Sequence, residues 1–293
     1  MTEKIPKKLA VITGANGGIG QEIAIGLARA GMRIIMTARN PSKGRAAVER
    51  VQRESGNPEI ALLLADFARL HEVRRLAAEI HQREPRVNVL VNNAGLALGR
   101  REETEDGHEA VLQINHLAPF LLTQLLLPTL TGGHEARVIN IASDAHWLAP
   151  RRPLEDIQAE KRFSTWRVYG RSKLYNILFT KELATRLSRE EGSRAVAYSA
   201  HPGVVASGFG GDGDLGPINA LGYKLGRVVM LSPAQGARTP IMLATADPVP
   251  GHTGDYFWRG RRRTPSKLGR DRALAKELWD ISEALVGLRE EPS

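Results

Sequence analysis

The chain has 293 residues, 42% of them hydrophobic, so it can bury the core of one large α/β domain or two ordinary ones. It contains no cysteine, which excludes disulfide bridges, a thiol nucleophile and any cysteine-based metal site. The formal charge of +9 suits a phosphorylated ligand, nucleic acid or an anionic surface, and does not choose between them.

No segment has the pattern of a targeting signal. Residues 1–8 are charged and pass directly into a strand pattern, without the apolar region of a signal peptide. The most apolar stretch, 118–130, contains polar residues and proline and is too short to cross a bilayer. We therefore expect a cytoplasmic protein without a membrane span.

The densest basic run is Arg259-Gly260-Arg261-Arg262-Arg263. It lacks the interleaved aromatic residues that binders of single-stranded nucleic acid use. We interpret it as a solvated basic loop; a nucleic-acid site is the alternative, and it rests on charge alone. No nucleic-acid partner is expected.

Short β-rich runs alternate with longer amphipathic stretches, which predicts a parallel sheet with helices on both faces. No repeat or low-complexity linker divides the chain, so a single domain is expected over 1–293, with a core of about 8–260 and a C-terminal basic loop and helix at 261–293. The expected strands are 9–13, 33–38, 60–65, 87–91, 137–141, 195–199 and 255–258. The expected helices are 20–30, 43–54, 70–82, 107–130, 169–189, 233–244 and 273–285.

A glycine-rich turn follows the first expected strand and contains Gly14, Asn16, Gly18, Ile19 and Gly20. Glycines allow a tight turn and let the backbone approach a pyrophosphate at the N-terminus of the following helix. An ordinary strand–helix loop is the alternative. The position of the turn on the first strand of an alternating pattern favours a dinucleotide site.

The residue that ends the second strand decides which ribose such a site accepts. An acidic residue would accept a hydrogen bond from a free 2′-hydroxyl, but this chain has Arg39 there, with Lys43 and Arg45 close behind. A guanidinium can pair with a 2′-phosphate through two hydrogen bonds. A solvated arginine at the start of a loop is the alternative. The turn predicts NADP as the cofactor.

Further polar turns follow the third and fourth expected strands. They hold Asp66 and Phe67, and then Asn93, Ala94 and Gly95. Ligands of open α/β sheets bind at the carboxyl ends of strands, so these turns should border the same crevice. Asp66 is suited to accept from an adenine amino group.

Ser143 lies just past the fifth expected strand, and Tyr169 and Lys173 open the following helix on one face. Asn115 lies inside a helical stretch, and Pro119 follows four residues later. Proline has no N–H, so the Asn115 carbonyl should lose its helical partner and could hold a water beside Lys173. An ordinary helix kink is the alternative.

Taken in order and spacing, these motifs resemble the short-chain dehydrogenase/reductases over about residues 8–260. Finer features resemble the retinol-dehydrogenase-like branch of that family. The motifs are Thr13–Gly20, Asn92–Gly95, Asn115, Ser143, Tyr169 with Lys173, and His201-Pro202-Gly203; the finer features are Ala38-Arg39, Gln113–Leu117, the long interval from Ser143 to Tyr169, Ser172–Asn176 and Leu278-Trp279.

The resemblance implies a Rossmann fold with a doubly wound, mostly parallel seven-stranded sheet, NADP(H), and a lipophilic alcohol or carbonyl substrate. Two departures stand out. Ala142 replaces a second serine that many relatives carry, and the chain lacks the N-terminal anchor of the membrane-bound members.

Reduction of a carbonyl requires a proton for its oxygen, and Tyr169 is expected to supply it. A free phenol has a pKa near 10, which the ammonium of Lys173 should lower. Ser143 would hydrogen-bond the substrate oxygen. The resemblance adds Asn115 to this catalytic set, lets Tyr169 and Lys173 also contact the cofactor, and gives Lys173 the nicotinamide ribose.

The segment after the sixth strand should surround the nicotinamide, through Pro202, Gly203 and Val205. A glycine-dense run at 208–216, followed by apolar residues at 218–231, suggests a substrate lid. A disordered loop is the alternative. Neither His146 nor His201 has metal-ligand spacing, and no metal is expected. Apolar residues of this region that suggest a hydrophobic pocket are Phe209, Leu215, Leu221 and Tyr223.

The sequence therefore predicts an NADP(H)-dependent oxidoreductase acting on a small alcohol or carbonyl. A catalytically silent NADP-binding regulator and a basic scaffold for nucleic acid are the competing hypotheses. A homo-oligomer is possible, and the sequence does not decide it.

Overall fold

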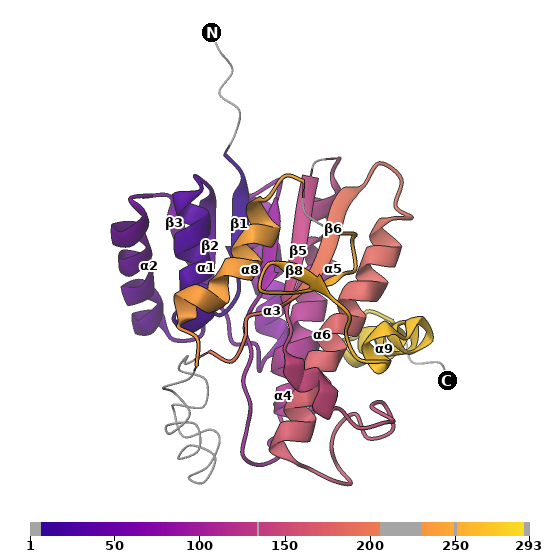
Figure 1. Cartoon of the computed structure of the whole chain (residues 1–293). Coiled ribbons are helices and arrows are strands. Elements are labelled where there is room, and N and C mark those ends of the chain that lie inside the picture. Colours follow the sequence, from indigo (N-terminus) through magenta and orange to yellow (C-terminus); the bar gives the residue numbers. More distant parts are fainter. Residues whose placement is uncertain (1–6, 134, 206–229, 249–250, 290–293) are drawn as a thin grey trace.

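One sheet of eight strands organises the part of the chain that the computed structural model describes, residues 7–133, 135–205, 230–248 and 251–289 (Figure 1). Its strands are β1 (Leu9–Ile12), β2 (Arg33–Ala38), β3 (Ile60–Leu64), β4 (Val89–Asn92), β5 (Glu135–Ile141), β6 (Arg194–His201), β7 (Tyr256–Trp258) and β8 (Arg261–Arg263). The longer helices are α1 (Gly18–Arg29), α2 (Pro41–Ser55), α3 (Leu70–Arg83), α5 (Ala118–Thr131), α6 (Thr165–Leu187), α8 (Pro233–Thr245) and α9 (Arg272–Leu285). The short ones are α4 (Ala110–Leu112), the π-helical turn η1 (Gln113–Leu117) and the 3₁₀ helices η2 (Asp144–Leu148) and η4 (Leu268–Arg270).

The strand order is β3-β2-β1-β4-β5-β6-β7-β8, and all neighbours are parallel except the pair β7–β8. The chain runs outward from β1 to β3, then returns to place β4 beside β1. The predicted doubly wound sheet is therefore confirmed. Open sheets of this kind bind ligands where the strand order reverses, at the carboxyl ends of β1 and β4.

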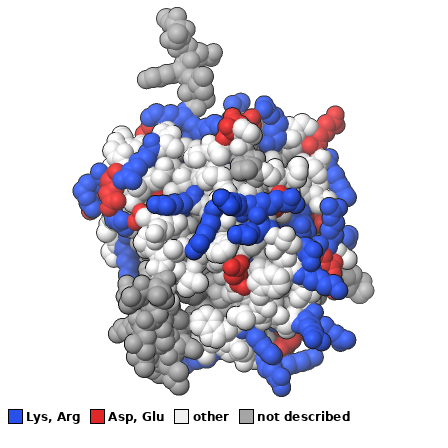
Figure 2. Space-filling view, viewed as in Figure 1, with Lys and Arg blue, Asp and Glu red and all other residues white. Residues whose placement is uncertain are grey.

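The expectation of seven strands and a solvated basic loop was wrong at the C-terminal edge. Arg259 and Gly260 form a two-residue turn with φ of 50° and 70°, and Arg261–Arg263 return antiparallel to β7 as β8. Such turns suit a tight hairpin, and glycine adopts the positive φ readily. The guanidiniums of Arg259 and Arg263 lie 4.8 Å and 5.1 Å from the ring centre of Trp258. These two cation–π contacts also stabilise the hairpin. Figure 2 shows basic side chains in a band over this part of the molecule.

Helices cover both faces of the sheet, and each face has its own apolar core. All four residues of β1 are buried: Leu9 and Val11 belong to one core, while Ala10 and Ile12 belong to the other. Side chains alternate along a strand, so a strand buried on both faces reads as a continuous apolar run. The helices α1, α2 and α8 cover one face, and α3, α5, α6 and α9 cover the other (Figure 1).

Helix boundaries follow local signals where those exist. The side chain of Asn40 caps α2 by accepting from the backbone of Ser42 and Lys43, and Gly56 ends this helix at φ 72°. The helix α6 begins at Thr165, four residues earlier than expected. Tyr169 therefore lies in the second turn of α6 and not at its first residue.

One helical stretch among the described residues, Ala110–Thr131, is long and apolar enough to cross a membrane by length and composition alone. In the fold, 78% of its most apolar window is buried. Core helices of α/β folds pass the same test, so composition does not distinguish a membrane span from a core helix here.

Candidate active site

The two turns at the reversal point of the sheet are hydrogen-bonded to each other. The hydroxyl oxygen of Thr13 accepts from the backbone N–H of Asn93 at 2.9 Å and of Ala94 at 3.0 Å. The amide of Asn93 donates back to the carbonyls of Thr13 at 2.9 Å and Gly14 at 3.2 Å. The expected cofactor residues of β1 and β4 therefore form one rigid unit.

Two glycines allow this close approach. A Cβ on Gly14 would lie 2.9 Å from the Cα of Ala94, and one on Gly20 would lie 2.4 Å from the amide nitrogen of Asn93. Gly17 is different, since a Cβ there would meet nothing within 4 Å. It is also the N-cap of α1 and provides no side-chain cap for the first N–H groups of that helix.

The opposite wall of this turn comes from the segment after β6. A Cβ on Gly236, in α8, would lie 2.7 Å from Val205, 3.4 Å from the carbonyl of Pro202 and 3.5 Å from Ile19. Gly203 adopts φ 92°, which glycine allows. Pro202 and Val205 therefore lie near Ile19 of the glycine-rich turn, and Gly236, which the sequence analysis missed, makes room for them. Their expected contact with the nicotinamide stays a prediction.

Arg39 and Asp66 lie at the carboxyl ends of β2 and β3, apart from the catalytic candidates. Arg39 is exposed. Two residues before it, Thr37 ties β2 to the glycine-rich turn: its backbone carbonyl accepts from the N–H of Ala15 and its hydroxyl from the N–H of Gly14. Asp66 accepts from the backbone of Ala68, which shapes its own turn. Phe67 is buried beneath it.

The helix expected at 107–130 contains a π-helical turn, η1, that the sequence analysis did not anticipate. In η1 the N–H of Ala118 donates to the carbonyl of Gln113, five residues back. Such turns are frequent at functional sites. The Asn115 side chain, within this turn, donates to Leu96 and to the hydroxyl of Ser172, and accepts from the N–H of Leu96 at 2.8 Å. The expected role of its main-chain carbonyl stays a prediction.

Asn115 and Lys173 both contact Gly95. A Cβ on Gly95 would lie 3.1 Å from the carbonyl oxygen of the Asn115 side chain and 3.5 Å from Nζ of Lys173. Residues from β4, η1 and α6 are therefore brought together at one point. The Lys173 ammonium is buried, donates to the carbonyl of Ile141 at 3.1 Å, and burial lowers its pKa to about 8.

The hydroxyl of Ser143 lies next to the phenol of Tyr169 and favours its ionised form, so the two expected catalytic groups meet. The expected direction of the tyrosine pKa was wrong for this structure. Burial raises the pKa of Tyr169, and the hydroxyl of Ser143 opposes that rise only in part. Nζ of Lys173 lies 5.5 Å from the centre of the tyrosine ring and is bonded to Ile141, so its charge does not offset burial.

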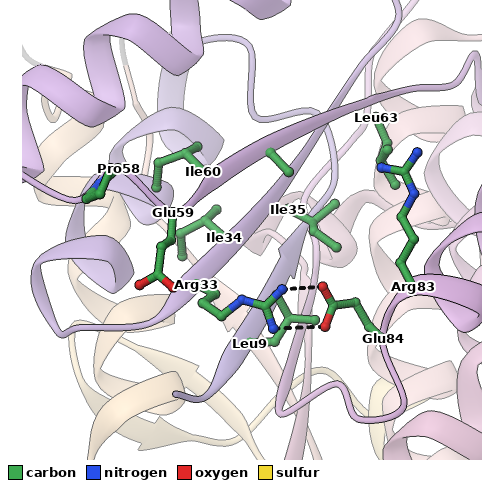
Figure 3. A pocket seen from close by; sticks show the side chains of 11 residues that line it. Leu9, Arg33, Ile34, Ile35, Pro58, Glu59, Ile60, Leu63, Arg83 and Glu84 are labelled. Carbon is green, nitrogen blue, oxygen red and sulfur yellow. Dashed lines mark hydrogen bonds and ion pairs between the residues drawn. The ribbon is translucent and has the colours of Figure 1, made fainter. Parts of the chain in front are cut away.

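A hollow of about 340 Å³ lies at the opposite end of the sheet, near the amino ends of β1, β2 and β3 (Figure 3). Two of its charged residues form an ion pair, in which Arg33 donates to both carboxylate oxygens of Glu84. No catalytic candidate lies there. The expected lid at 208–216, residues 218–229 and the pocket residues Phe209, Leu215, Leu221 and Tyr223 fall outside the described residues.

A family model described as short chain dehydrogenase matches residues 8–212. The chain belongs to the short-chain dehydrogenase family. Retinol dehydrogenase 12 of Mus musculus is 37% identical over 286 residues, covering 98% of this chain and 88% of that protein. Retinol dehydrogenase 13 of Homo sapiens is 37% identical over 293 residues, covering 99% and 87%.

Solved structures of the short-chain dehydrogenase fold are similar to this chain. An uncharacterized protein from Mycobacterium paratuberculosis has a TM-score of 0.76 at 32% identity, covering 97% of this chain and 96% of that one. The RhlG/NADP active-site complex of Pseudomonas aeruginosa has a TM-score of 0.65 at 27% identity, covering 92% and 96%. The family and its named dehydrogenases show that this chain is an oxidoreductase.

Proposed function

We propose that this oxidoreductase interconverts an alcohol and a carbonyl on a small lipophilic substrate, with NADP(H) as its cofactor. The observation that carries the proposal is the meeting of Tyr169 and Ser143 beside Lys173 at the carboxyl ends of the strands. A catalytically silent regulator would not require this arrangement.

The residues around the glycine-rich turn fit a dinucleotide. Gly14 and Gly20 keep the two turns in contact, and the uncapped N-terminus of α1 can hold a pyrophosphate. The nicotinamide, when bound, supplies or accepts the hydride. The protein's own task is to hold the substrate oxygen and to move a proton.

The preference for NADP rests on Arg39. The first turn of α2, which starts two residues later, contains no acidic side chain, so nothing there repels a 2′-phosphate. Arg39 is exposed at the carboxyl end of β2 and can form a bidentate pair with such a group. The similar RhlG structure is an NADP complex, which supports the same choice.

Tyr169 is the proton donor and acceptor in this proposal. Its phenol can protonate a carbonyl oxygen, and the hydroxyl of Ser143 can donate to the same oxygen and stabilise developing charge. A cationic Lys173 beside the ring favours the phenolate that remains. Asn115 holds Leu96 and Ser172, and so fixes η1 against the start of α6.

Large apolar side chains are exposed around this pair, which favours a lipophilic substrate. Trp147 (61% exposed) and Leu148 (51%) follow Ser143 in η2. The exposed ring of Trp166 lies 6.5 Å from that of Tyr169. Single exposed apolar residues are ordinary, but several around one site indicate a surface for an apolar ligand.

The test is NADPH oxidation by the pure protein in the presence of aldehydes, ketones and quinones of increasing apolar size, with NADH in parallel. We expect turnover with NADPH, rising with apolar size. Binding of NADPH without turnover on any substrate would favour the silent regulator. A preference for NADH in the wild type would overturn the reading of Arg39.

The absence of a membrane span and the cytoplasmic location also stay proposals. Fractionation of cells that express the full chain, with and without a carbonate wash, tests both. The same material, run on a calibrated sizing column, reports whether the chain forms a homo-oligomer.

A further inference from the structure

His146 lies three residues after Ser143, in η2, and is 1% exposed. Its Nδ1 lies 2.7 Å from the carbonyl oxygen of Ser143, and its backbone N–H donates to the same oxygen at 3.0 Å. A carbonyl oxygen only accepts, so Nδ1 carries the hydrogen.

The other ring nitrogen faces a donor. The backbone N–H of Ser266 donates to Nε2 of His146 at 3.0 Å, so Nε2 carries no hydrogen. The two bonds together define one neutral tautomer, and burial lowers the pKa of His146 in agreement with it. Ser266 lies beyond β8, which means that the imidazole fastens the segment of Ser143 to the C-terminal part of the chain.

Asp144, which directly follows Ser143, is anchored as well. The carboxylate of Asp144 accepts from the hydroxyl of Tyr256 at 2.7 Å and lies 3.3 Å from Nε2 of His201. The ring of Tyr256 packs edge-on against that of His146, with centres 5.4 Å apart. The Ser143 hydroxyl, just before these two anchored residues, accepts from the backbone N–H of Ala145 at 3.1 Å and lies next to the phenol of Tyr169.

We propose that His146 is a positioning residue for Ser143: it holds the serine carbonyl through Nδ1 and the C-terminal segment through Nε2, and thereby orients the serine hydroxyl toward Tyr169 and the substrate oxygen. The inference rests on the catalytic role proposed for Ser143. A 3₁₀ helix after a strand has weak internal bonding, and a misplacement of about 1 Å costs about a hundredfold in rate.

Two substitutions separate the two halves of the contact. The side-chain amide of His146→Asn reaches the Nδ1 position, so it keeps the donor to Ser143 and loses the acceptor for Ser266. The longer His146→Gln reaches the Nε2 position and keeps only the Ser266 half. We expect kcat to fall by about tenfold or more in His146→Gln and by no more than about threefold in His146→Asn, with the Kd for NADPH within about twofold of wild type in both.

A merely structural histidine predicts a different result, in which kcat falls equally in both variants or follows the loss of Tm. Either outcome overturns the inference. His146→Ala loses both bonds, and a wild-type kcat in that folded variant would also overturn it.

Ser143→Ala distinguishes this inference from the proposed function. If Ser143→Ala keeps wild-type turnover, the catalytic role of Ser143 fails, and the role of His146 fails with it. If Ser143→Ala is inactive while His146→Gln turns over normally, only the positioning role fails.

Discussion

The ammonium of Lys173 lies 5.5 Å from the centre of the Tyr169 ring but donates its hydrogen bond to the carbonyl of Ile141. The hydroxyl of Ser143 is the neighbouring group that favours ionisation of the phenol. Lys173 therefore makes no hydrogen bond to the phenol, and burial governs the pKa of Tyr169. The serine is the group that contacts the proton donor.

Tyr169→Phe removes that donor and leaves the ring packed against Trp166. We expect kcat to fall by about 10²–10⁴, the usual contribution of a general acid. The Kd for NADPH, measured by quenching of tryptophan fluorescence, should stay close to wild type because the glycine-rich turn is unchanged. Near-normal turnover would show that another group supplies the proton.

Arg39→Asp should exchange the cofactor preference. A 2′-phosphate would then face a carboxylate, which should weaken NADPH binding by about 2 kcal/mol or more. NADH carries a free 2′-hydroxyl there and should gain relative to NADPH. Isothermal titration with both nucleotides measures this, and Arg45→Asp is the matched control, because Arg45 lies further along α2. An equal effect of both substitutions would indicate general electrostatics instead of a specific contact.

Gly20→Ala should destabilise the fold, while Gly17→Ala should not. The new Cβ at Gly20 would lie 2.4 Å from the amide nitrogen of Asn93 and 2.7 Å from the carbonyl of Gly14, and the overpacking should cost about 1–3 kcal/mol. A Cβ at Gly17 meets no protein atom within 4 Å. Urea unfolding of the two variants measures the difference. We expect Gly17→Ala to keep the stability of the wild type and to lose only affinity for NADPH. The reason is that its new Cβ would lie in the expected pyrophosphate site.

Acidification should destabilise the protein through His116. This side chain lies in η1 among aromatic rings, one nitrogen faces the hydroxyl of Ser282, and the other, Nδ1, is buried without a hydrogen-bond partner. Burial lowers its pKa to about 3, below the ordinary value of about 6.5. His116 therefore binds a proton in the unfolded chain but stays neutral in the folded chain. The free energy of unfolding decreases as the pH falls below about 6.5 toward about 3.

Between pH 7 and pH 5 this one group should lower the free energy of unfolding by about 2 kcal/mol. Burial also lowers the pKa of His146 and of His201, so both act in the same direction. His116→Phe removes the titrating group and fits the aromatic cluster, and Ser282 keeps its bond to the carbonyl of Leu278. Urea unfolding at the two pH values should show a smaller decrease in this variant; an unchanged decrease would assign the acid sensitivity to other groups.

The fold was largely predictable because its signals are local. Continuous apolar runs predicted the central strands, since strands buried on both faces cannot alternate. The helix expected at 43–54 is α2, and the structure extends it to Pro41–Ser55 between caps at Asn40 and Gly56. The short strand β8 was missed because three arginines resemble a solvated loop, and only the turn at Gly260 and the ring of Trp258 return them to β7.

The π-helical turn at Gln113–Leu117 was missed for a similar reason, because nothing in the local pattern distinguishes it from a regular helix. The pKa of Tyr169 was misjudged because the sequence shows that a lysine is near but not which oxygen it bonds. Burial and the carbonyl of Ile141 decide that competition.

The sequence by itself determined the family and the doubly wound sheet, and it singled out Ser143, Tyr169, Lys173 and Asn115 as catalytic candidates, because strand periodicity and motif spacing are properties of short segments. Only the tertiary structure decided how these residues are held. The contact of His146 with Ser266 and of Asp144 with Tyr256 joins positions more than a hundred residues apart, and such contacts form only when the sheet brings its strand ends together. The same closeness removes Lys173 and His116 from water, and that burial, which no sequence pattern encodes, sets their pKa values.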